Sequence, residues 1–338
     1  MRSALGWFSA LLLVGLLQPA AADTLADVQE RGTLRCGVNG LVPGLSLRDE
    51  AGRWSGLDVD FCRAVAAAAL GAKEKVELVP LTSEERLKAL AEGRVDLLSR
   101  NTTWTLSRDV AEGVSFVGVL YYDGQGFMVP RSTSLLSALE LTGKSVCALA
   151  GTTSVENAKR YFTRHRMELK LRTFEDWDAA RAAYLKGDCG VLTSDQSQLF
   201  ALRTTLEQPR GHRILPEVIS KEPLGPAVRH GDSRWFDVVR WTLFGLINAE
   251  EMGIDSGNVE RARELAESEE TRLLLDVDGT IAEALGLNPH WITRAIAQVG
   301  NYAEIFERNL GDQSPLKIKR GLNALWTDGG LHYAPPSR

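Results

Sequence analysis

The chain has 338 residues, of which 44% are hydrophobic and 25% are charged, and its formal net charge is -5. This length predicts about two domains or lobes with a sizeable globular core, and the acidic balance argues against nucleic-acid binding and a polybasic membrane role. The five histidines are scattered and the four cysteines form no C-x-x-C motif, so the sequence predicts no metal site and no cofactor.

Residues 1–22 have the pattern of a secretory signal peptide. Arg2 precedes an apolar core over about residues 4–17, and the alanines at 20–22 form an A-x-A cleavage site. The core is shorter than the roughly 20 apolar residues that a membrane-spanning helix needs. The first cysteine, Cys36, lies well beyond the cleavage site, which argues against an N-terminal lipid anchor. We therefore expect an exported, periplasmic protein; a buried N-terminal helix is the alternative.

The first part of the remaining chain alternates between strand-like and helix-like segments. Strands are predicted at 33–38, 75–81 and 95–99, and helices at 58–70 and 83–93. The second helix ends at a glycine, as many helices do. Alternation of this kind predicts a parallel α/β sheet.

The same alternation then recurs. Strands are predicted at 144–151, 169–174 and 189–195, and helices at 153–165 and 175–187. Thr153 or Ser154 is the candidate N-cap of the first of these helices. Two similar α/β units in series predict two lobes. Because ligands of open α/β sheets bind at the carboxyl ends of the strands, the polar residues that follow each strand are the candidates for a site.

The cysteines divide between the two units. Cys36 and Cys62 fall in the first unit, and Cys147 and Cys189 fall in the second. Four cysteines in an exported protein predict two disulfides, and pairing within each unit is the simplest of the possible connectivities.

Three strand ends carry polar residues with complementary chemistry. After the strand predicted at 95–99, Arg108 lies among several hydroxyl side chains, an arrangement that suits a carboxylate. Thr152 and Thr153 open a helix, whose free N–H groups bind anions. Asp195 ends a strand and can pair with an ammonium group. Each stretch alone also fits a solvated loop or an ordinary N-cap. Together the three stretches offer what an α-amino acid requires.

Several motifs resemble ABC-transporter solute-binding proteins of the polar amino-acid family (family 3), and in particular the general L-amino-acid binders. The motifs are G-x-D-V-D-F-C-R-A-V-A (56–66), L-K-A-L-x-x-G-x-V-D (87–96), T-x-T-L-S-R (103–108), Y-D-G-Q-G-F (122–127), G-T-T (151–153), T-S-D-Q-S (193–197), K-E-P-L-G-P-A-V-R (221–229) and G-N-Y-A-E-I-F-E-R-N (300–309). The resemblance implies an α/β, two-lobed periplasmic-binding-protein fold of type II with a helical C-terminal extension.

The resemblance also implies domain boundaries. Lobe 1 would comprise 23–128 and 223–253, lobe 2 would comprise 129–222, and 254–338 would form the helical extension packing on lobe 1. The ligand would be buried between the lobes when they close about their hinge.

The resemblance assigns roles to residues of this sequence. Arg108 would clamp the α-carboxylate of the ligand, assisted by Thr103 and the backbone near Asn101. Thr152 and Thr153 would contact the same carboxylate from lobe 2.

The ammonium and the ligand side chain would meet a second set of residues. Asp195 would take the α-ammonium. Ser83 falls near the position where many members place an aromatic residue, which predicts a roomier or more polar pocket that suits broad or Glu/Gln/Asp/Asn-type ligands. Tyr122 could supply an aromatic wall instead, as could its neighbour Tyr121 or Trp104.

The expected function is binding of an L-amino acid and its delivery to the membrane permease subunits of an ABC transporter by a monomeric protein that is not an enzyme. Exported dehydratases of prephenate- or arogenate-like acids use the same fold and are the enzymatic alternative. A sensor domain is a further alternative, although no signalling segment accompanies it.

One motif points elsewhere. LLLDVDGTIAEAL (273–285) resembles the start of haloacid-dehalogenase phosphatases, in which the positions of Asp276 and Asp278 would hold Mg²⁺ and attack phosphate. Too few residues follow it to form a Rossmann-like domain, and a match of this length is weak. The other interpretation is a turn between two C-terminal helices.

Overall fold

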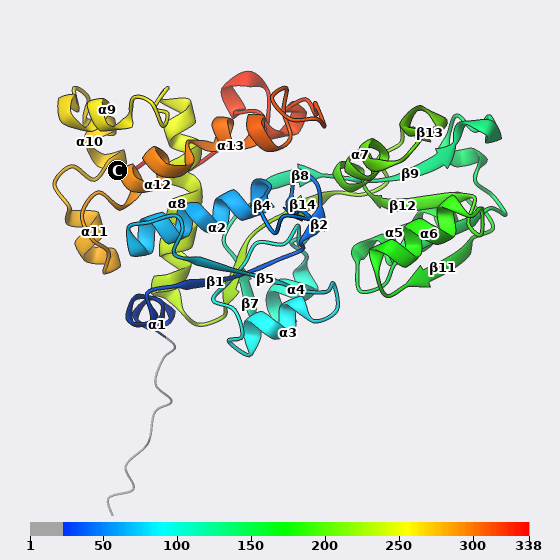
Figure 1. Cartoon of the computed structure of the whole chain (residues 1–338), viewed down its shortest axis with the longest axis horizontal. Helices are drawn as coiled ribbons and strands as arrows, with labels where there is room; N and C mark the ends of the chain where they lie inside the picture. The colour runs from blue at the N-terminus through cyan, green and yellow to red at the C-terminus, as the bar shows by residue number, and fades with distance from the viewer. Residues whose placement is uncertain (1–22, 338) are drawn as a thin grey trace, which may run out of the picture.

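The computed structural model describes residues 23–337, so the predicted signal peptide lies outside the described residues. Two five-stranded sheets form two lobes, which lie side by side along the long axis of the molecule (Figure 1). The first sheet has the order β5 (Val76–Pro80), β1 (Leu34–Val38), β6 (Leu97–Leu98), β15 (Ala227–Arg229) and β7 (Val114–Phe116). β1 runs parallel to β5 and β6, as the alternation predicted, and β15 is antiparallel to its neighbours.

The second sheet repeats this arrangement. Its order is β11 (Lys170–Phe174), β10 (Ser145–Leu149), β12 (Val191–Asp195), β9 (Gln125–Pro130) and β13 (His212–Ile214). β9 pairs with β12 from Gln125 onward. The boundary expected after residue 128 therefore falls inside a strand of the second sheet, since β9 begins at Gln125 and already pairs with β12 there.

Helices cover both sheets. They are α1 (Thr24–Arg31), α2 (Leu57–Leu70), α3 (Arg86–Ala91), α4 (Leu106–Ala111) and α8 (Ser233–Glu251) on the first lobe, and α5 (Thr153–Arg164), α6 (Trp177–Leu185) and α7 (Gln196–Thr205) on the second. The N-cap of α5 is Thr152, not Thr153 or Ser154. The helix begins at Thr153 as expected, but its cap lies one residue before the nearer candidate, because Thr152 takes the extended conformation of a cap while Thr153 is already helical.

Two short antiparallel strands link the lobes. β8 (Tyr121–Asp123) and β14 (Glu222–Leu224) pair so that Asp123 lies opposite Glu222. Gly124 separates β8 from β9 of the second sheet. The two strands therefore place a pair of acidic residues at the hinge.

The rest of the first lobe consists of a small meander and the C-terminal extension. The meander is β2 (Leu41–Val42), β3 (Ser46–Arg48) and β4 (Trp54–Ser55), and the extension contains α9 (Val259–Leu265), α10 (Glu269–Leu274), α11 (Thr280–Leu285), α12 (Trp291–Val299) and α13 (Tyr302–Asn309). Single 3₁₀ turns occur at η1 (Arg131–Thr133), η2 (Ala138–Glu140), η3 (Pro209–Gly211), η4 (Gly321–Asn323) and η5 (Trp326–Asp328).

The extension packs on the first lobe. α12 contacts α2 and α8, and α9, α10 and α11 gather at the end far from the second lobe (Figure 1). Asp60 of α2 accepts hydrogen bonds from Arg308 and Asn309 of α13, both at 2.7 Å. The helical pattern over 290–309 forms two helices, since Gly300 lies between them at φ 96°, a conformation that suits glycine.

Both disulfides pair within a lobe. Cys36 of β1 bonds to Cys62 of α2, and Cys147 of β10 bonds to Cys189, just before β12. The connectivity expected from the sequence is confirmed. Each bridge joins a central strand to a neighbouring element, which limits the freedom of the unfolded chain.

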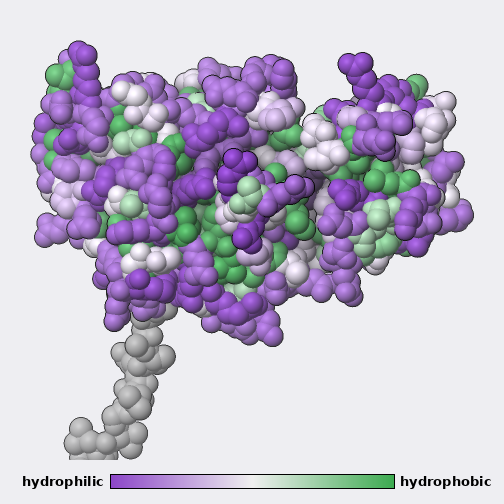
Figure 2. All heavy atoms as spheres, viewed as in Figure 1, coloured by the Kyte–Doolittle hydropathy of each residue, from purple (hydrophilic) through white to green (hydrophobic). Residues whose placement is uncertain are grey.

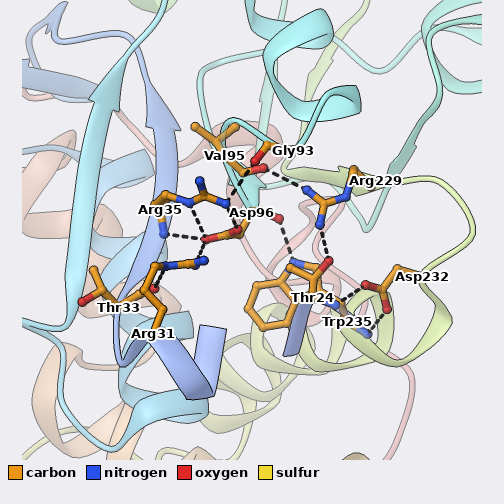
Figure 3. A network of polar contacts seen from close by, with 10 residues as sticks. All are labelled: Thr24, Arg31, Thr33, Arg35, Gly93, Val95, Asp96, Arg229, Asp232 and Trp235. Carbon is orange, nitrogen blue, oxygen red and sulfur yellow. Dashed lines mark hydrogen bonds and ion pairs between the residues drawn. The ribbon is translucent and has the colours of Figure 1, made fainter. Parts of the chain in front are cut away.

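A polar network fixes α1 to the end of the first lobe (Figure 3). Asp96 pairs with Arg31 and accepts from the Arg35 guanidinium at 2.9 Å. Thr24 donates its backbone N–H to Asp232 at 2.8 Å and accepts from Arg229 at 2.6 Å. The network is structural, because every charged group in it already has a partner.

Within residues 23–337 no helix is both long and apolar enough to cross a membrane. The face of the molecule in Figure 2 is mostly hydrophilic over both lobes. The apolar faces of the helices accordingly point inward, and α12, for example, buries Trp291, Ile292 and Ile296.

Candidate ligand-binding site

A small polar cavity of about 20 Å³ lies between the lobes. It is lined by Asn39, Ser83, Arg86, Arg100, Asn101, Thr103 and Arg108 from the first lobe, and by Leu149, Thr152, Thr153, Ser154, Ser194, Asp195 and Gln198 from the second. Seven of the eight residues predicted to bind ligand are among them. The carboxyl ends of the strands meet here, as expected for open α/β sheets.

Tyr122 is the exception. Its hydroxyl donates to the Leu331 carbonyl at 3.3 Å, and its ring packs edge-on against His332 of the C-terminal segment. Successive side chains of a strand point to opposite faces. Asp123 meets α7 of the second lobe, while Tyr122 packs on the C-terminal segment, so the structure does not bring Tyr122 into the lining of the cavity.

Arg108 is available for a carboxylate. α4 carries it, and the Thr105 side chain caps this helix by accepting from the Arg108 N–H. The guanidinium donates to the Thr103 carbonyl at 2.9 Å and forms no ion pair with any described carboxylate. Burial lowers its pKa, but an arginine remains charged at neutral pH. The cavity therefore contains a cation without a counterion from the described chain.

The start of α5 faces the cavity from the other lobe. The Thr152 hydroxyl donates to the Leu149 carbonyl at 2.6 Å, so no side chain caps the helix. The N–H groups of the first turn are left for another acceptor, and a helix N-terminus favours an anion. Gly151 precedes the helix at φ 67°, and a Cβ there would lie 2.8 Å from Glu84 of the first lobe, so the lobes are in contact at this point.

Asp195 is a buried carboxylate that pairs with no cation of residues 23–337. It ends β12, is 5% exposed, and accepts one side-chain hydrogen bond, from Gln198 at 3.0 Å. Burial raises its pKa well above the ordinary value, and the neighbouring Asp123 and Glu222 raise it further. An incoming ammonium group would relieve this unfavourable environment.

Asp123 and Glu222 were not predicted from the sequence. Asp123 accepts from the N–H groups of Gly124 at 2.8 Å and Ser197 at 3.3 Å, and burial raises its pKa to about 6. Glu222 is 1% exposed and lies opposite it on the linking strands. Both occur within the motifs that carry the family resemblance, but nothing in their spacing indicates that they lie beside Asp195.

Two further buried arginines were also missed. Arg100 donates to the Leu81 carbonyl at 2.8 Å and to the Ser83 hydroxyl at 3.2 Å, and burial lowers its pKa to about 10. Arg86 donates to the Ser83 carbonyl and, across the cleft, to the Gly151 carbonyl at 3.4 Å. Its Nε has no partner among the described residues. The site therefore has more positive charge than one α-carboxylate requires.

The small cavity continues into a larger pocket of about 440 Å³. The two share Asn39, Ser83, Arg100, Leu149 and Gln198. Trp54 of the first lobe and Trp177 of the second line the larger pocket, and Arg48 and Glu175 add charge to it. The aromatic wall thus comes from these tryptophans, while Trp104 instead stacks on Phe116.

The D-V-D-G-T motif does not form a catalytic centre. Asp276 is 3% exposed, and its carboxylate accepts from the backbone N–H groups of Ile281 at 3.0 Å and Ala282 at 2.7 Å. Asp278 pairs with Arg272 at 3.0 Å. The motif lies between α10 and α11, so the interpretation as a turn between two helices is confirmed and the phosphatase reading is wrong.

Replacing Asp276 tests this structural role. Asp276→Ala is expected to lower the free energy of unfolding by about 1–2 kcal/mol, because the first turn of α11 loses its acceptor. Asp276→Asn keeps an acceptor and tolerates the positive φ of 46°, so it should lose less. Chemical denaturation measures both variants. A Mg²⁺-dependent phosphatase activity that disappears in Asp276→Asn would contradict the assignment.

Two α/β lobes are joined at a hinge, and one cavity between them contains a guanidinium and a carboxylate that form no ion pair in the part of the chain that the structure describes. This arrangement defines a ligand-binding protein with the type II periplasmic-binding-protein fold. The chain belongs to the bacterial extracellular solute-binding proteins of family 3, whose family model matches residues 34–284. The resemblance that the motifs predicted is therefore confirmed.

Relatives extend the match over nearly the whole chain. The general L-amino acid-binding periplasmic protein AapJ of Rhizobium johnstonii is 50% identical over 331 residues, which cover 98% of this chain and 97% of that protein. The glutamate/glutamine/aspartate/asparagine-binding protein BztA of Rhodobacter capsulatus is 45% identical over 333 residues, 98% of each chain. These matches do not favour the dehydratase alternative.

A solved structure is similar along its whole length. The periplasmic binding protein of an ABC transporter from Brucella ovis, solved with glutathione bound, is 50% identical with a TM-score of 0.91. The match covers 94% of this chain and 100% of that one.

Proposed function

We propose that this protein binds L-amino acids in the periplasm and delivers them to the permease subunits of an ABC transporter. The main support is that one cavity contains both a guanidinium, Arg108 on the first lobe, and a buried carboxylate, Asp195 on the second, and that neither forms an ion pair with any described residue. A zwitterion satisfies both groups at once. Since they lie on different lobes, the ligand has a higher affinity for the closed state and stabilises it.

The polar residues next to this pair favour acidic and amide side chains. Ser83, Arg100, Asn39 and Gln198 lie where the small cavity opens into the larger pocket, so they are placed to meet the ligand side chain. A guanidinium and two amides suit carboxylate and carboxamide groups. We propose that Glu, Gln, Asp and Asn are among the preferred ligands, as the name of BztA states for that relative.

Glutathione-like ligands are a second candidate class. The pocket of about 440 Å³ beyond Ser83 and Arg100 can accept a side chain much longer than that of glutamate, and Trp54 and Trp177 flank it. The structure from Brucella ovis contains glutathione, whose γ-glutamyl group has the α-amino and α-carboxylate groups of an amino acid. The same Arg108 and Asp195 would hold that group.

The remaining properties follow from the proposed role. The protein would act as a monomer, without catalysis, after export directed by residues 1–22 and cleavage of that segment. Its partners would be the amino acid and the permease, and no nucleic acid.

Thermal unfolding against a ligand panel tests the proposal. We expect several L-amino acids, with Glu and Gln among the strongest, to raise the melting midpoint of the oxidised protein from residue 23 onward. A ligand at 100 times its dissociation constant adds about 2.7 kcal/mol of stability. The D-enantiomers serve as the matched control, and glutathione tests the second class. If none of these compounds shifts the midpoint or gives heat in calorimetry, the proposal is wrong.

A further inference from the structure

The Glu222 carboxylate accepts four hydrogen bonds at the hinge. Its Oε2 accepts from the hydroxyls of Thr103 at 2.6 Å and Thr153 at 2.9 Å. Its Oε1 accepts from Asn157 Nδ2 and from the Ser220 hydroxyl, both at 2.6 Å. Thr103 belongs to the first lobe and Thr153 to the second, so a single carboxylate oxygen binds a hydroxyl from each.

These contacts determine what the two threonines can offer a ligand. A hydroxyl has one proton and two lone pairs. Because each proton is donated to Glu222, the two oxygens can only accept a further hydrogen bond. The oxygens lie 3.4 Å apart and both threonines line the small cavity. They are therefore poor partners for the carboxylate of a ligand and good partners for its ammonium group.

We propose that Glu222 is a positioning residue that orients the Thr103 and Thr153 hydroxyls as acceptors, so that they form the ammonium end of the site together with Asp195. This inference rests on the proposed amino-acid binding and deepens it. It revises the expected contact of both threonine side chains with the α-carboxylate, which is left to Arg108 and the first N–H groups of α5. Discrimination in favour of a 2-amino group then depends on a residue that does not touch the ligand.

The substitution Glu222→Gln is expected to reverse the direction of the hydrogen bonds between residue 222 and the two threonine hydroxyls. The Asn157 amide oxygen already accepts from Arg160, which fixes Asn157 Nδ2 as a donor toward residue 222. The carbonyl oxygen of a glutamine therefore stays on that side, and its NH₂ group turns toward the threonines. Their hydroxyls then accept from the amide and point their own protons into the cavity, where they oppose an ammonium group and suit a carbonyl group.

Calorimetric titration of Glu222→Gln with L-glutamate and with 2-oxoglutarate measures this effect. Since hydrogen bonds to charged groups contribute about 1.5–3 kcal/mol, we expect the affinity for L-glutamate to fall by about tenfold or more. The preference for L-glutamate over 2-oxoglutarate, measured by competition, should shrink by a similar factor. Ser220→Ala is the matched control, since it removes a donor from the other carboxylate oxygen and should change neither value appreciably.

A double-mutant cycle with Thr103→Val separates positioning from folding. If Glu222 acts through the Thr103 hydroxyl, Glu222→Gln should cost far less affinity for L-glutamate in the Thr103→Val protein than in the wild type. Melting of each ligand-free variant verifies that it is folded. Additive losses, or equal losses for L-glutamate and 2-oxoglutarate, would overturn the inference alone. Failure of the wild-type protein to bind any compound of the panel would instead overturn the proposed function.

Discussion

Arg108→Ala is expected to weaken the binding of every L-amino acid by at least about a hundredfold, because a buried bidentate pair with the α-carboxylate is lost. The α-carboxylate is common to all such ligands, so the loss should not depend on the ligand side chain. Arg108 has no other carboxylate partner among the described residues, and the ligand-free fold should tolerate the change. Isothermal titration with L-glutamate and L-glutamine measures the loss.

Two further variants test whether the loss depends on the geometry of the guanidinium and on its position in the site. Arg108→Lys retains the charge but not the planar fork, so it should recover only part of the affinity. Arg94→Ala removes a guanidinium from the exposed surface of the same lobe and should bind as the wild type does. Retention of L-glutamate binding by Arg108→Ala, with Arg100→Ala abolishing it, would show that the α-carboxylate lies at Arg100 instead.

Much of the fold follows from local patterns. The helix expected at 58–70 is observed at Leu57–Leu70, and the alternation of strands and helices predicted both parallel cores. The strand ends indicated Arg108, Thr152, Thr153 and Asp195, because the topology of an α/β sheet brings carboxyl ends together whatever the sequence between them. The resemblance added Asn101, Thr103 and Ser83, and all seven residues line the small cavity.

The site residues that the sequence did not predict owe their positions to contacts between segments that are far apart in the chain. Asp123 and Glu222 lie on linking strands of three residues each, too short for an alternating pattern to show which side chains face the cleft. Arg86 and Arg100 resemble surface arginines in sequence, but both are buried in the folded protein, and Arg86 reaches the Gly151 carbonyl of the other lobe. A single sequence has no signal for such burial.

The D-V-D segment at residues 58–60 is a second case in which the sequence does not reveal what each side chain contacts. Asp58 accepts from the Ser99 hydroxyl at 2.8 Å and from the Asn101 N–H at 3.0 Å, so it holds the loop that lines the cavity. Asp60, two residues later, holds α13 of the C-terminal extension. The motif could be recognised from the sequence, but its division between site and extension required the structure.

Asp195→Asn is expected to weaken L-amino acid binding by about a hundredfold while raising the melting midpoint of the ligand-free protein at pH 7.5. The binding loss reflects the missing anionic partner of the α-ammonium. The gain in stability has a separate cause, because Asp195 is buried near Asp123 and Glu222, and removing one of three neighbouring carboxylates relieves burial and repulsion. Asp178→Asn, an equal charge change on the exposed surface of α6, should change neither quantity.

The pH dependence distinguishes this explanation from a general gain in packing. The pKa values of Asp195 and Asp123 are raised in the folded state, to about 6 for Asp123, above the unfolded value of 3.8. The folded protein therefore binds more protons than the unfolded chain, and these groups make the ligand-free protein less stable as the pH rises through that window.

The stability difference between Asp195→Asn and the wild type should accordingly shrink as the pH falls from 7.5, because the raised pKa of Asp195 lets the buried carboxylate take up a proton and lose its charge. Saturating L-glutamate should remove most of the difference by stabilising only the wild type. A variant that melts below the wild type at pH 7.5 would contradict the argument. The expected result would mean that the ligand-free site is strained by its own charges, and that part of the affinity comes from the ammonium group relieving this strain.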